Sequence, residues 1–285
     1  VESVNFNYDT ADPVLTETTV GDQTQQVSNV DVIFGGDATD TNSLTSLEVS
    51  VNGGAGIAIT VQPDDSWSYT VLNTLPDGEY ELIFTATDVA GRTDSLTRYA
   101  LIDDAAPALP VINAFNGAYA IDSLDTSGTA TDATSGLDTV EYQFDGTGGA
   151  WTTVTGTSNW FATIDISAGG ANLAEGDHDL HIRATDRAGN SSTDASQAFV
   201  VDRNNPTVTV TGYTGTVYKN ANFTITGTAT DTLDFGGSPV AVTVTNSGGS
   251  VDLSGFAIVV TGSGTSRNWS QEVPIALQGD YEVTI

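Results

Sequence analysis

Aspartate is the residue of this sequence that could do chemistry, because it is abundant and recurs in the same turns. The chain carries 37 Asp and Glu residues against 7 Lys and Arg, for a net charge of −30. An Ala-Thr-Asp turn ends at Asp40, Asp132 and Asp231, and a second one at Asp88 and Asp186. Carboxylates that gather within a few ångströms repel one another, and hard oxygen ligands suit Ca²⁺. The pattern therefore favours calcium, while turn capping by Asp is the structural alternative.

Residues for other kinds of chemistry are scarce. Cys is absent, which excludes disulfides, redox thiols and thiolate metal sites. The two histidines, His178 and His181, are an odd number of residues apart, so a regular strand places them on opposite faces and they cannot chelate one ion. No phosphate-binding loop or nucleophile elbow is present. We therefore expect no catalysis.

The charge and hydropathy of the chain also exclude two classes of partner. Nucleic acids and anionic membrane surfaces need Lys and Arg to neutralise phosphate, and this chain has few of them. No apolar run approaches the roughly 18 residues of a membrane helix. We expect no nucleic-acid binding and no membrane insertion in this segment.

The aspartate-bearing turns belong to a repeat with a period of about 95 to 100 residues. Its landmarks are a Pro that enters a strand, the first Ala-Thr-Asp turn, a Trp, a turn into an alternating strand, and the second Ala-Thr-Asp loop. The Trp landmark falls at Trp67, Trp160 and Trp269, and the turn into the alternating strand at Pro76–Leu82, Glu175–Leu180 and Gln278–Val283. The repeat predicts domains at 11–104, 105–204 and 205–285, the third without its last strand, with 1–10 as the last strand of a preceding unit.

Alternation within each unit indicates half-buried antiparallel strands. In the strand after the fourth landmark, Tyr80, Leu82 and Phe84 share one face, and His178 occupies the position of Tyr80 in the second unit. Runs of this kind predict an all-β fold of tandem antiparallel sandwiches with about seven strands each. Tyr80 follows an acidic-Gly turn, as in the tyrosine corner of such sandwiches.

The chain ends are out of phase with the unit, and two explanations stay open. One is a window cut from a longer array. The other is polymerisation by strand addition, in which residues 1 to 9 of one chain fill the place of the missing last strand of another.

The repeat resembles the bacterial Ig-like domains found in tandem in large secreted adhesins, biofilm proteins and other surface proteins. The loop Ala184–Asn190 with the following strand and linker to Pro206 carries the resemblance, as does Val140–Gly146 followed by Trp151–Val154. The resemblance implies an extracellular spacer on the bacterial cell surface, often stiffened by Ca²⁺ between domains. Gly91-Arg92 departs from the Gly-Asn of the motif, and the third unit lacks this loop.

Sandwich topology predicts where the aspartates meet. The loops after the second and sixth strands return to the pole at which the chain enters, so both face the linker from the preceding domain. We expect Asp103 and Asp104 near Asp132 and Asp186. In the same way, we expect Asp9 and Asp12 near Asp40 and Asp88. We likewise expect Asp202, with Asn204 and Asn205, near Asp231. The proposed calcium ligands are Asp40, Asp88, Asp103, Asp104, Asp132, Asp186, Asp202 and Asp231.

The sequence thus predicts a non-catalytic extracellular array, the stalk or spacer of an adhesin, with neighbouring Ig-like domains of the same or an adjacent chain as partners. A filament or surface-layer subunit is the alternative structural role. Carbohydrate binding is the other alternative, with surface glycans as partners, and Trp151 is its candidate contact because it has no counterpart in the other units.

Overall fold

The chain consists of β-strands in this computed structural model, and none of the residues it describes lies in a helix. Val, Thr and aromatic side chains fit a pleated surface, while Gly, Asp and Asn form the turns. The expected all-β class is confirmed. The described residues are 2–4, 7–19, 25–115, 119–146, 148–213, 218–233, 240–246, 248–275 and 280–285.

The chain divides into two compact units. The first comprises Val1–Asn116, Leu124–Ile164 and His178–Phe199. The second comprises Gly117–Ser123, Asp165–Asp177 and Val200–Ile285. The predicted domain boundaries near residues 104 and 204 stay predictions.

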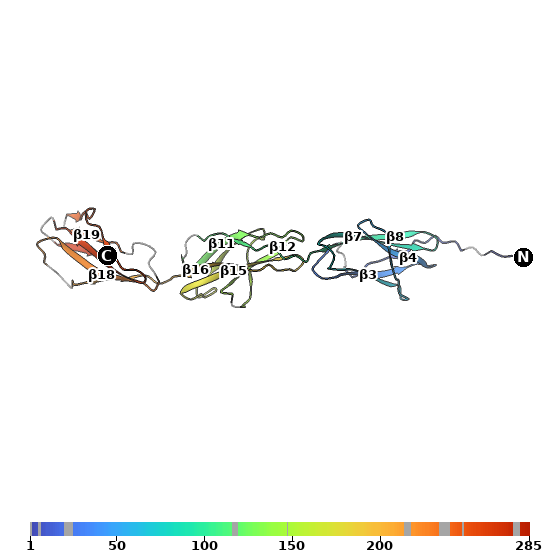
Figure 1. The fold of residues 1–285 in the computed structure, drawn as a ribbon, viewed down its shortest axis with the longest axis horizontal. Coiled ribbons are helices and arrows are strands. Elements are labelled where there is room, and N and C mark those ends of the chain that lie inside the picture. The colour runs from blue at the N-terminus through green and yellow to red at the C-terminus, as the bar shows by residue number, and fades with distance from the viewer. Residues whose placement is uncertain are drawn as a thin grey trace. The chain divides into compact units, whose positions relative to one another are not determined.

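The first eight strands form two sheets, ordered β1-β3-β6 and β2-β8-β7-β4-β5 (Figure 1). β1 pairs antiparallel with β3, whereas β2 pairs parallel with β8. The first of the seven expected strands is therefore split between the two sheets. The strands are β1 (Val14–Leu15), β2 (Gln25–Ser28), β3 (Val32–Thr39), β4 (Leu44–Val51), β5 (Ile57–Ile59), β6 (Ser66–Val71), β7 (Gly78–Asp88) and β8 (Thr93–Ile102).

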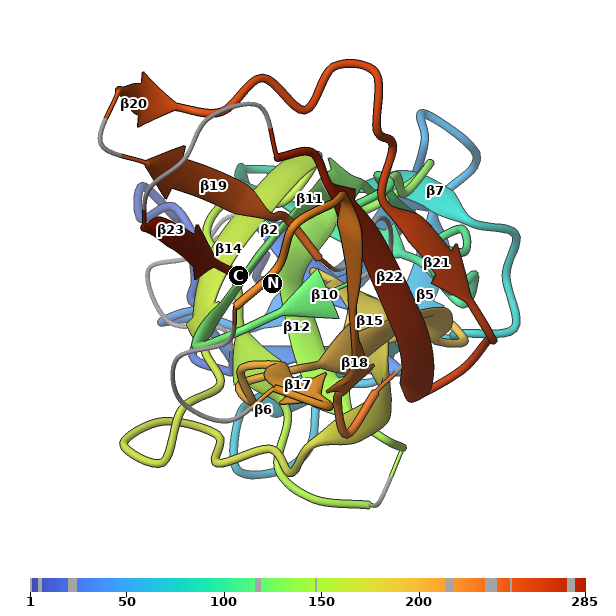
Figure 2. The ribbon, with the colours of Figure 1, turned by 90° about the vertical axis from the view of Figure 1, so that its left-hand side faces the viewer.

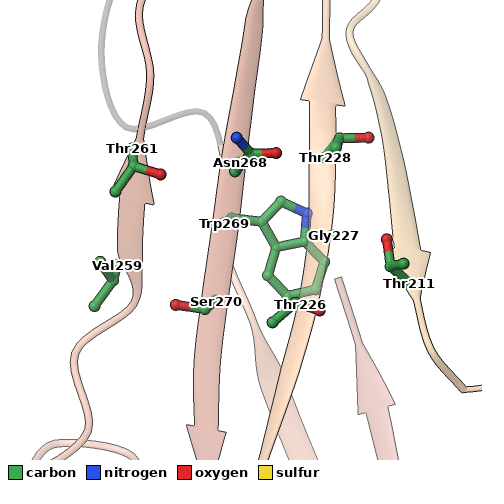
Figure 3. Close-up of a pocket in the computed structure, with 9 residues that line it drawn as sticks. All are labelled: Thr211, Thr226, Gly227, Thr228, Val259, Thr261, Asn268, Trp269 and Ser270. Carbon is green, nitrogen blue, oxygen red and sulfur yellow. The ribbon is translucent and has the colours of Figure 1, made fainter.

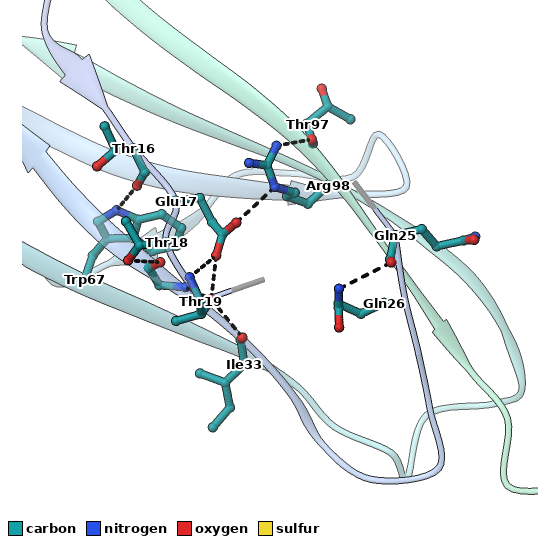
Figure 4. Close-up of polar contacts among 11 residues, drawn as sticks. Thr16, Glu17, Thr18, Thr19, Gln25, Gln26, Ile33, Trp67, Thr97 and Arg98 are labelled. Carbon is teal, nitrogen blue, oxygen red and sulfur yellow. Dashed lines mark hydrogen bonds and ion pairs between the residues drawn. The ribbon is translucent and has the colours of Figure 1, made fainter. Parts of the chain in front are cut away.

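Polar contacts bind the segment after β1 to both sheets (Figure 4). The carbonyl oxygen of Thr16 accepts a hydrogen bond from the Trp67 indole of β6 at 3.2 Å. The Glu17 carboxylate, whose side chain is 0% exposed, accepts one from Arg98 Nε of β8 at 3.1 Å. The same carboxylate accepts from the backbone N–H of Thr19 at 2.7 Å. A partly buried ion pair thus joins this segment to the five-stranded sheet.

Aromatic rings fill the core between the two sheets. The Phe84 ring of β7 lies 4.8 Å from that of Trp67 and 5.9 Å from that of Phe34, measured between centroids. All three side chains are buried. Each stabilises the fold by roughly 1.5–3 kcal/mol relative to an exposed side chain.

The next eight strands repeat this arrangement, with sheets ordered β14-β11-β9 and β10-β16-β15-β12-β13 (Figure 1). β9 pairs antiparallel with β11, and β10 pairs parallel with β16, as β1 and β2 do with β3 and β8. The strands are β9 (Val111–Ile112), β10 (Tyr119–Ala120), β11 (Ser123–Thr129), β12 (Leu137–Phe144), β13 (Thr152–Thr153), β14 (Asn159–Asp165), β15 (Gly176–Asp186) and β16 (Ala195–Val201).

The last seven strands form sheets ordered β17-β18-β22-β21 and β20-β19-β23, and Figure 2 shows β17, β18, β22 and β21 side by side. Their core contains Ile225, Val244, Trp269 and Val273. The strands are β17 (Thr207–Thr211), β18 (Phe223–Thr230), β19 (Thr243–Asn246), β20 (Gly249–Ser250), β21 (Val259–Thr261), β22 (Ser266–Val273) and β23 (Tyr281–Thr284).

The predicted alternation holds in β7 and β15. Leu82 and Phe84 are buried in β7, as are Leu180 and Ile182 in β15. The Tyr80 hydroxyl donates a hydrogen bond to the Pro76 carbonyl at 2.7 Å, which is the tyrosine corner expected from the sequence.

Two expectations concern residues at the chain ends. Residues 2–4 and 7–10 lie in no strand, and Val1, Asn5 and Phe6 are outside the described residues, so a strand over 1–10 stays a prediction. Gln278 and Gly279 of the fourth landmark are also outside the described residues.

Candidate metal centres

Three carboxylates from separate segments meet where the chain enters the first sandwich. Asp9 precedes β1, Asp40 follows β3, and Asp88 is the last residue of β7. One oxygen from each lies within 4.8 Å of the other two. Asp88 is 1% exposed. The loops after the second and sixth strands of the sandwich thus meet the entering segment, which is the topological reason for the cluster.

The two oxygens of each carboxylate in this cluster have different surroundings. Oδ1 of Asp9 accepts from the Ala11 N–H, Oδ1 of Asp40 from those of Asn42 and Ser43, and Oδ1 of Asp88 from those of Ala90 and Arg92. Oδ2 of Asp9, Asp40 and Asp88 is buried and has no hydrogen-bond partner. Turn capping therefore accounts for one oxygen of each aspartate and leaves the other unexplained.

The hydrogen bonds also affect proton affinity at Asp40. The backbone N–H groups of Asn42, then Ser43, hold the pKa of the Asp40 carboxyl below its ordinary value. These hydrogen bonds therefore favour the ionised form of the Asp40 carboxyl.

A second cluster has the same origin in the second sandwich. Asp103 lies in the linker after β8, Asp132 in the loop after β11, and Asp186 ends β15. One oxygen from each lies within 4.8 Å of the other two, and Asp103 and Asp186 are almost fully buried. Asp103 Oδ2 accepts from the Ser135 N–H at 2.9 Å. Asp132 Oδ1 accepts from the N–H groups of Thr134 and Gly136.

Asn190 supplies further hydrogen bonds of the second cluster, in addition to the one that the Ala105 N–H donates to Asp103 Oδ1. Its backbone N–H donates to Asp186 Oδ1 at 2.8 Å, and its amide Nδ2 lies 2.8 Å from Asp186 Oδ2. The same Nδ2 lies 2.9 Å from the Asp103 carbonyl and 3.3 Å from the Ala105 carbonyl. Asn190 belongs to the loop motif visible in the sequence, but the motif does not indicate this contact with the linker.

The other expected ligands lie outside these groups. Asp104 is exposed, and its N–H donates to Asp77. Asp12, which was expected near Asp40 and Asp88 although not as a ligand, forms an exposed ion pair with Arg92. Asp231 caps its own turn through Thr232, and Asp202 accepts from the Asn204 N–H at 3.3 Å. Within the described part of the chain, these last two belong to no group of three carboxylates.

The histidines each pair with one aspartate on opposite faces of β15. His178 Nδ1 lies 2.8 Å from Asp145, and its ring packs against Phe199 at 5.9 Å between centroids. His181 Nδ1 lies 2.7 Å from Asp194. The two imidazoles therefore have different aspartate partners.

Trp151 carries a cation on its ring. The Arg183 guanidinium carbon lies 4.4 Å from the ring centroid, and Arg183 also donates to Glu141 through Nε and Nη2 at 3.0 and 2.9 Å. This cation–π contact occupies part of the surface proposed for a sugar.

An open pocket of about 340 Å³ lies on the sheet of β18 and β22 (Figure 3). None of its lining side chains is ionisable, although the chain carries a net charge of −30. The lining residues are Thr211, Thr226, Gly227, Thr228, Val259, Thr261, Asn268, Trp269 and Ser270.

Among the described residues, no helix could span a lipid bilayer.

The first sandwich is similar to a known family of domains. Residues 13–104 match the profile of a family described as "Bacterial Ig-like domain". The second sandwich repeats the strand order of the first. No curated protein matches the chain.

Solved structures are similar to the chain at low identity. Fibronectin(III)-like modules of Clostridium thermocellum CbhA are 16% identical, covering 66% of this chain and 94% of theirs, with a TM-score of 0.38. A 1.5-MDa bacterial ice-binding adhesin is 18% identical, covering 93% and 88%, with a TM-score of 0.37. A tetra-tandem repeat from the extending region of a large adhesion protein is 21% identical, covering 90% and 69%, with a TM-score of 0.32.

Proposed function

We propose that the chain is a non-catalytic extracellular spacer, part of the stalk of a bacterial surface adhesin, and that Ca²⁺ binds its carboxylate clusters. The observation that carries the calcium proposal is the set of three buried Oδ2 atoms without hydrogen-bond partners at Asp9, Asp40 and Asp88. Buried charges without partners are unfavourable, and three like charges at this distance add repulsion. A bound cation removes both penalties.

The donor set fits Ca²⁺ better than other metals. Ca²⁺ takes 6 to 8 oxygen ligands in flexible geometry, whereas zinc favours Cys and His. The chain has no Cys, and both histidines pair with aspartates outside the clusters. Asp9, Asp40 and Asp88 would hold one ion, and Asp103, Asp132 and Asp186 a second.

The proposed role of the cation is mechanical. Asp9 and Asp103 lie in the segments that enter the first and second sandwiches, and their partners lie in loops of those sandwiches. An ion at either cluster would add contacts between the entering segment and the following domain, which lowers the conformational entropy of the linker. Extracellular calcium modules bind in the range of about 10⁻⁴ to 10⁻³ M. A cell-surface location supplies that concentration.

Isothermal titration calorimetry tests the calcium proposal. We expect the wild-type chain to bind Ca²⁺, and Asp88→Asn to weaken one site by about tenfold or more, because the charge at a buried ligand is lost. Asp104→Asn is the matched control, since Asp104 lies outside both clusters. Absence of binding at millimolar Ca²⁺ would leave the aspartates as turn-capping residues and reject the proposal.

Carbohydrate binding is a second candidate function, favoured by the pocket on β18 and β22. Its hydroxyl and amide side chains, with no ionisable neighbour, suit a neutral sugar. Glycan-array binding that is lost in Thr228→Val and Ser270→Ala would support this site. If glycan binding is instead lost in Trp151→Ala, the sugar-binding site includes Trp151 rather than the pocket. Assembly into a filament by strand addition, with residues 1 to 9 as the donated strand, stays a prediction.

A further inference from the structure

We infer that the two carboxylate clusters respond differently to calcium. Hydrogen bonds from Asn190 hold the Asp103 cluster and its linker together without a cation, whereas the Asp9 cluster needs a cation to hold its entering segment in place. This inference rests on the proposed function, because it assigns each cluster its own dependence on the same ion. Asn190 acts here as a positioning residue.

The side chain of Asn190 takes up contacts that a cation would otherwise make. Its Nδ2 lies within hydrogen-bond distance of Asp186 Oδ2 and of two linker carbonyls, those of Asp103 and Ala105. Asp103 Oδ1 accepts a hydrogen bond from the Ala105 N–H, and its Oδ2 accepts one from the Ser135 N–H. Two of the three carboxylates therefore have partners on both oxygens, and the linker is bound to the second sandwich through its own backbone.

Arg92 occupies the equivalent position beside the Asp9 cluster. Both residues stand four positions after the last aspartate of the motif, and both donate a backbone N–H to its Oδ1 at 2.8 Å. The side chains then diverge. The Arg92 guanidinium turns to Asp12, in a pair whose side chains are 39% and 64% exposed. Asp88 Oδ2 receives no amide and stays without a partner.

The difference predicts unequal order when calcium is absent. An exposed ion pair contributes little to stability. The segment of Asp9 is thus held weakly while its cluster keeps three unpartnered buried oxygens. The segment of Asp103 is held by amide-to-carbonyl hydrogen bonds that need no ion.

Hydrogen exchange with mass spectrometry on the full chain tests this, in Ca²⁺ and in excess EDTA. In the wild type we expect chelation to reduce amide protection of residues 9–15 by about tenfold or more and to change that of residues 103–109 by less than about twofold. In Asn190→Ala we expect residues 103–109 to become EDTA-sensitive as well, with protection restored by Ca²⁺. Ser191→Ala, which removes a hydroxyl beside Asn190, is the matched control and should behave as wild type.

The failures of the two proposals are distinguishable. Equal loss of protection in both segments of the wild type would overturn the inference while calcium binding stands. Residues 103–109 of Asn190→Ala that stay insensitive to EDTA would also overturn it, with unchanged β15 exchange showing that the variant is folded. Asn190→Asp, which keeps the side-chain shape and loses the donor, should reproduce the Asn190→Ala result. No calorimetric binding and no response in either segment would instead reject the proposed function itself.

Discussion

A carboxylate has two oxygens, and in the first cluster the two have different surroundings: Oδ1 caps a turn, and Oδ2 is the proposed calcium ligand. Oδ1 of Asp9, Asp40 and Asp88 accepts backbone N–H groups, as expected for an aspartate that caps a turn. Oδ2 of the same residues is buried without a partner. Residue type alone cannot separate these roles, since a capping Asp and a ligand Asp look alike in the sequence.

The buried Glu17 carboxylate gives a prediction at the same scale. Its side chain is fully excluded from solvent and pairs with Arg98. Glu17→Gln should lower the free energy of unfolding of the first sandwich by about 1.5–3 kcal/mol, because a hydrogen bond to a charged group is weakened in a buried site. Hydrogen exchange of the β7 amides measures this sandwich separately from the others.

Asp12→Asn is the control for Glu17→Gln, because it makes the same change in net charge at an exposed ion pair. We expect its effect to stay within about 1 kcal/mol. If the two variants lower the free energy of unfolding equally, the burial of the Glu17 carboxylate does not add to stability.

At the scale of elements, each buried Trp is matched by a glycine on the neighbouring strand. A Cβ on Gly128 would lie 1.9 Å from the Val111 carbonyl oxygen and 2.4 Å from the Trp160 ring. A Cβ on Gly227 would meet the Thr209 carbonyl oxygen at 1.8 Å and the Trp269 ring at 2.6 Å. The close approach of the first strand and the ring leaves no room for a side chain.

Gly128→Ala should therefore destabilise the second sandwich by about 3 kcal/mol, the upper part of the range for overpacking. Hydrogen exchange of the β15 amides measures it. Gly169→Ala is the control, since the only neighbour of a Cβ there is Ser167 Oγ at 3.8 Å. A neutral Gly128→Ala would show that the strand and the ring can move apart at little cost.

The elements also show how far sequence reasoning reaches in this protein. Period-two alternation predicted the buried faces of β7 and β15, and the acidic-Gly turn predicted the Tyr80 corner, because both depend on short-range geometry. The split of the first strand into β1 and β2 was not predicted, because it depends on which sheet each half finds in space.

The carboxylate groups divide in the same way. Topology predicted that Asp103, Asp132 and Asp186 converge, since strand order alone brings their loops to one pole. Side-chain direction, which neighbouring strands and loops determine, explains why Asp104 lies outside the cluster. It also determines the contacts of Asn190 and Arg183. Spacing in the sequence carries no such information.

At the scale of the whole molecule, the net charge of −30 opposes the compact state. Any salt screens this repulsion over a Debye length of about 8 Å at 0.15 M, whereas a specific site responds to one ion at low concentration. Calcium should therefore stabilise the chain beyond its contribution to ionic strength.

Thermal unfolding in Ca²⁺, Mg²⁺ and NaCl at matched ionic strength separates the two effects. If Ca²⁺ binds only the folded state, a free concentration of 100 times the dissociation constant adds about 2.7 kcal/mol of stability. Mg²⁺ should add less, because it demands octahedral geometry and gives up its waters reluctantly. We expect the midpoint temperature for unfolding of the first sandwich to be highest in Ca²⁺. In the double variant Asp40→Asn with Asp88→Asn, this midpoint in Ca²⁺ should fall to its value in NaCl. Equal midpoints in all three salts would show that screening alone stabilises this acidic chain.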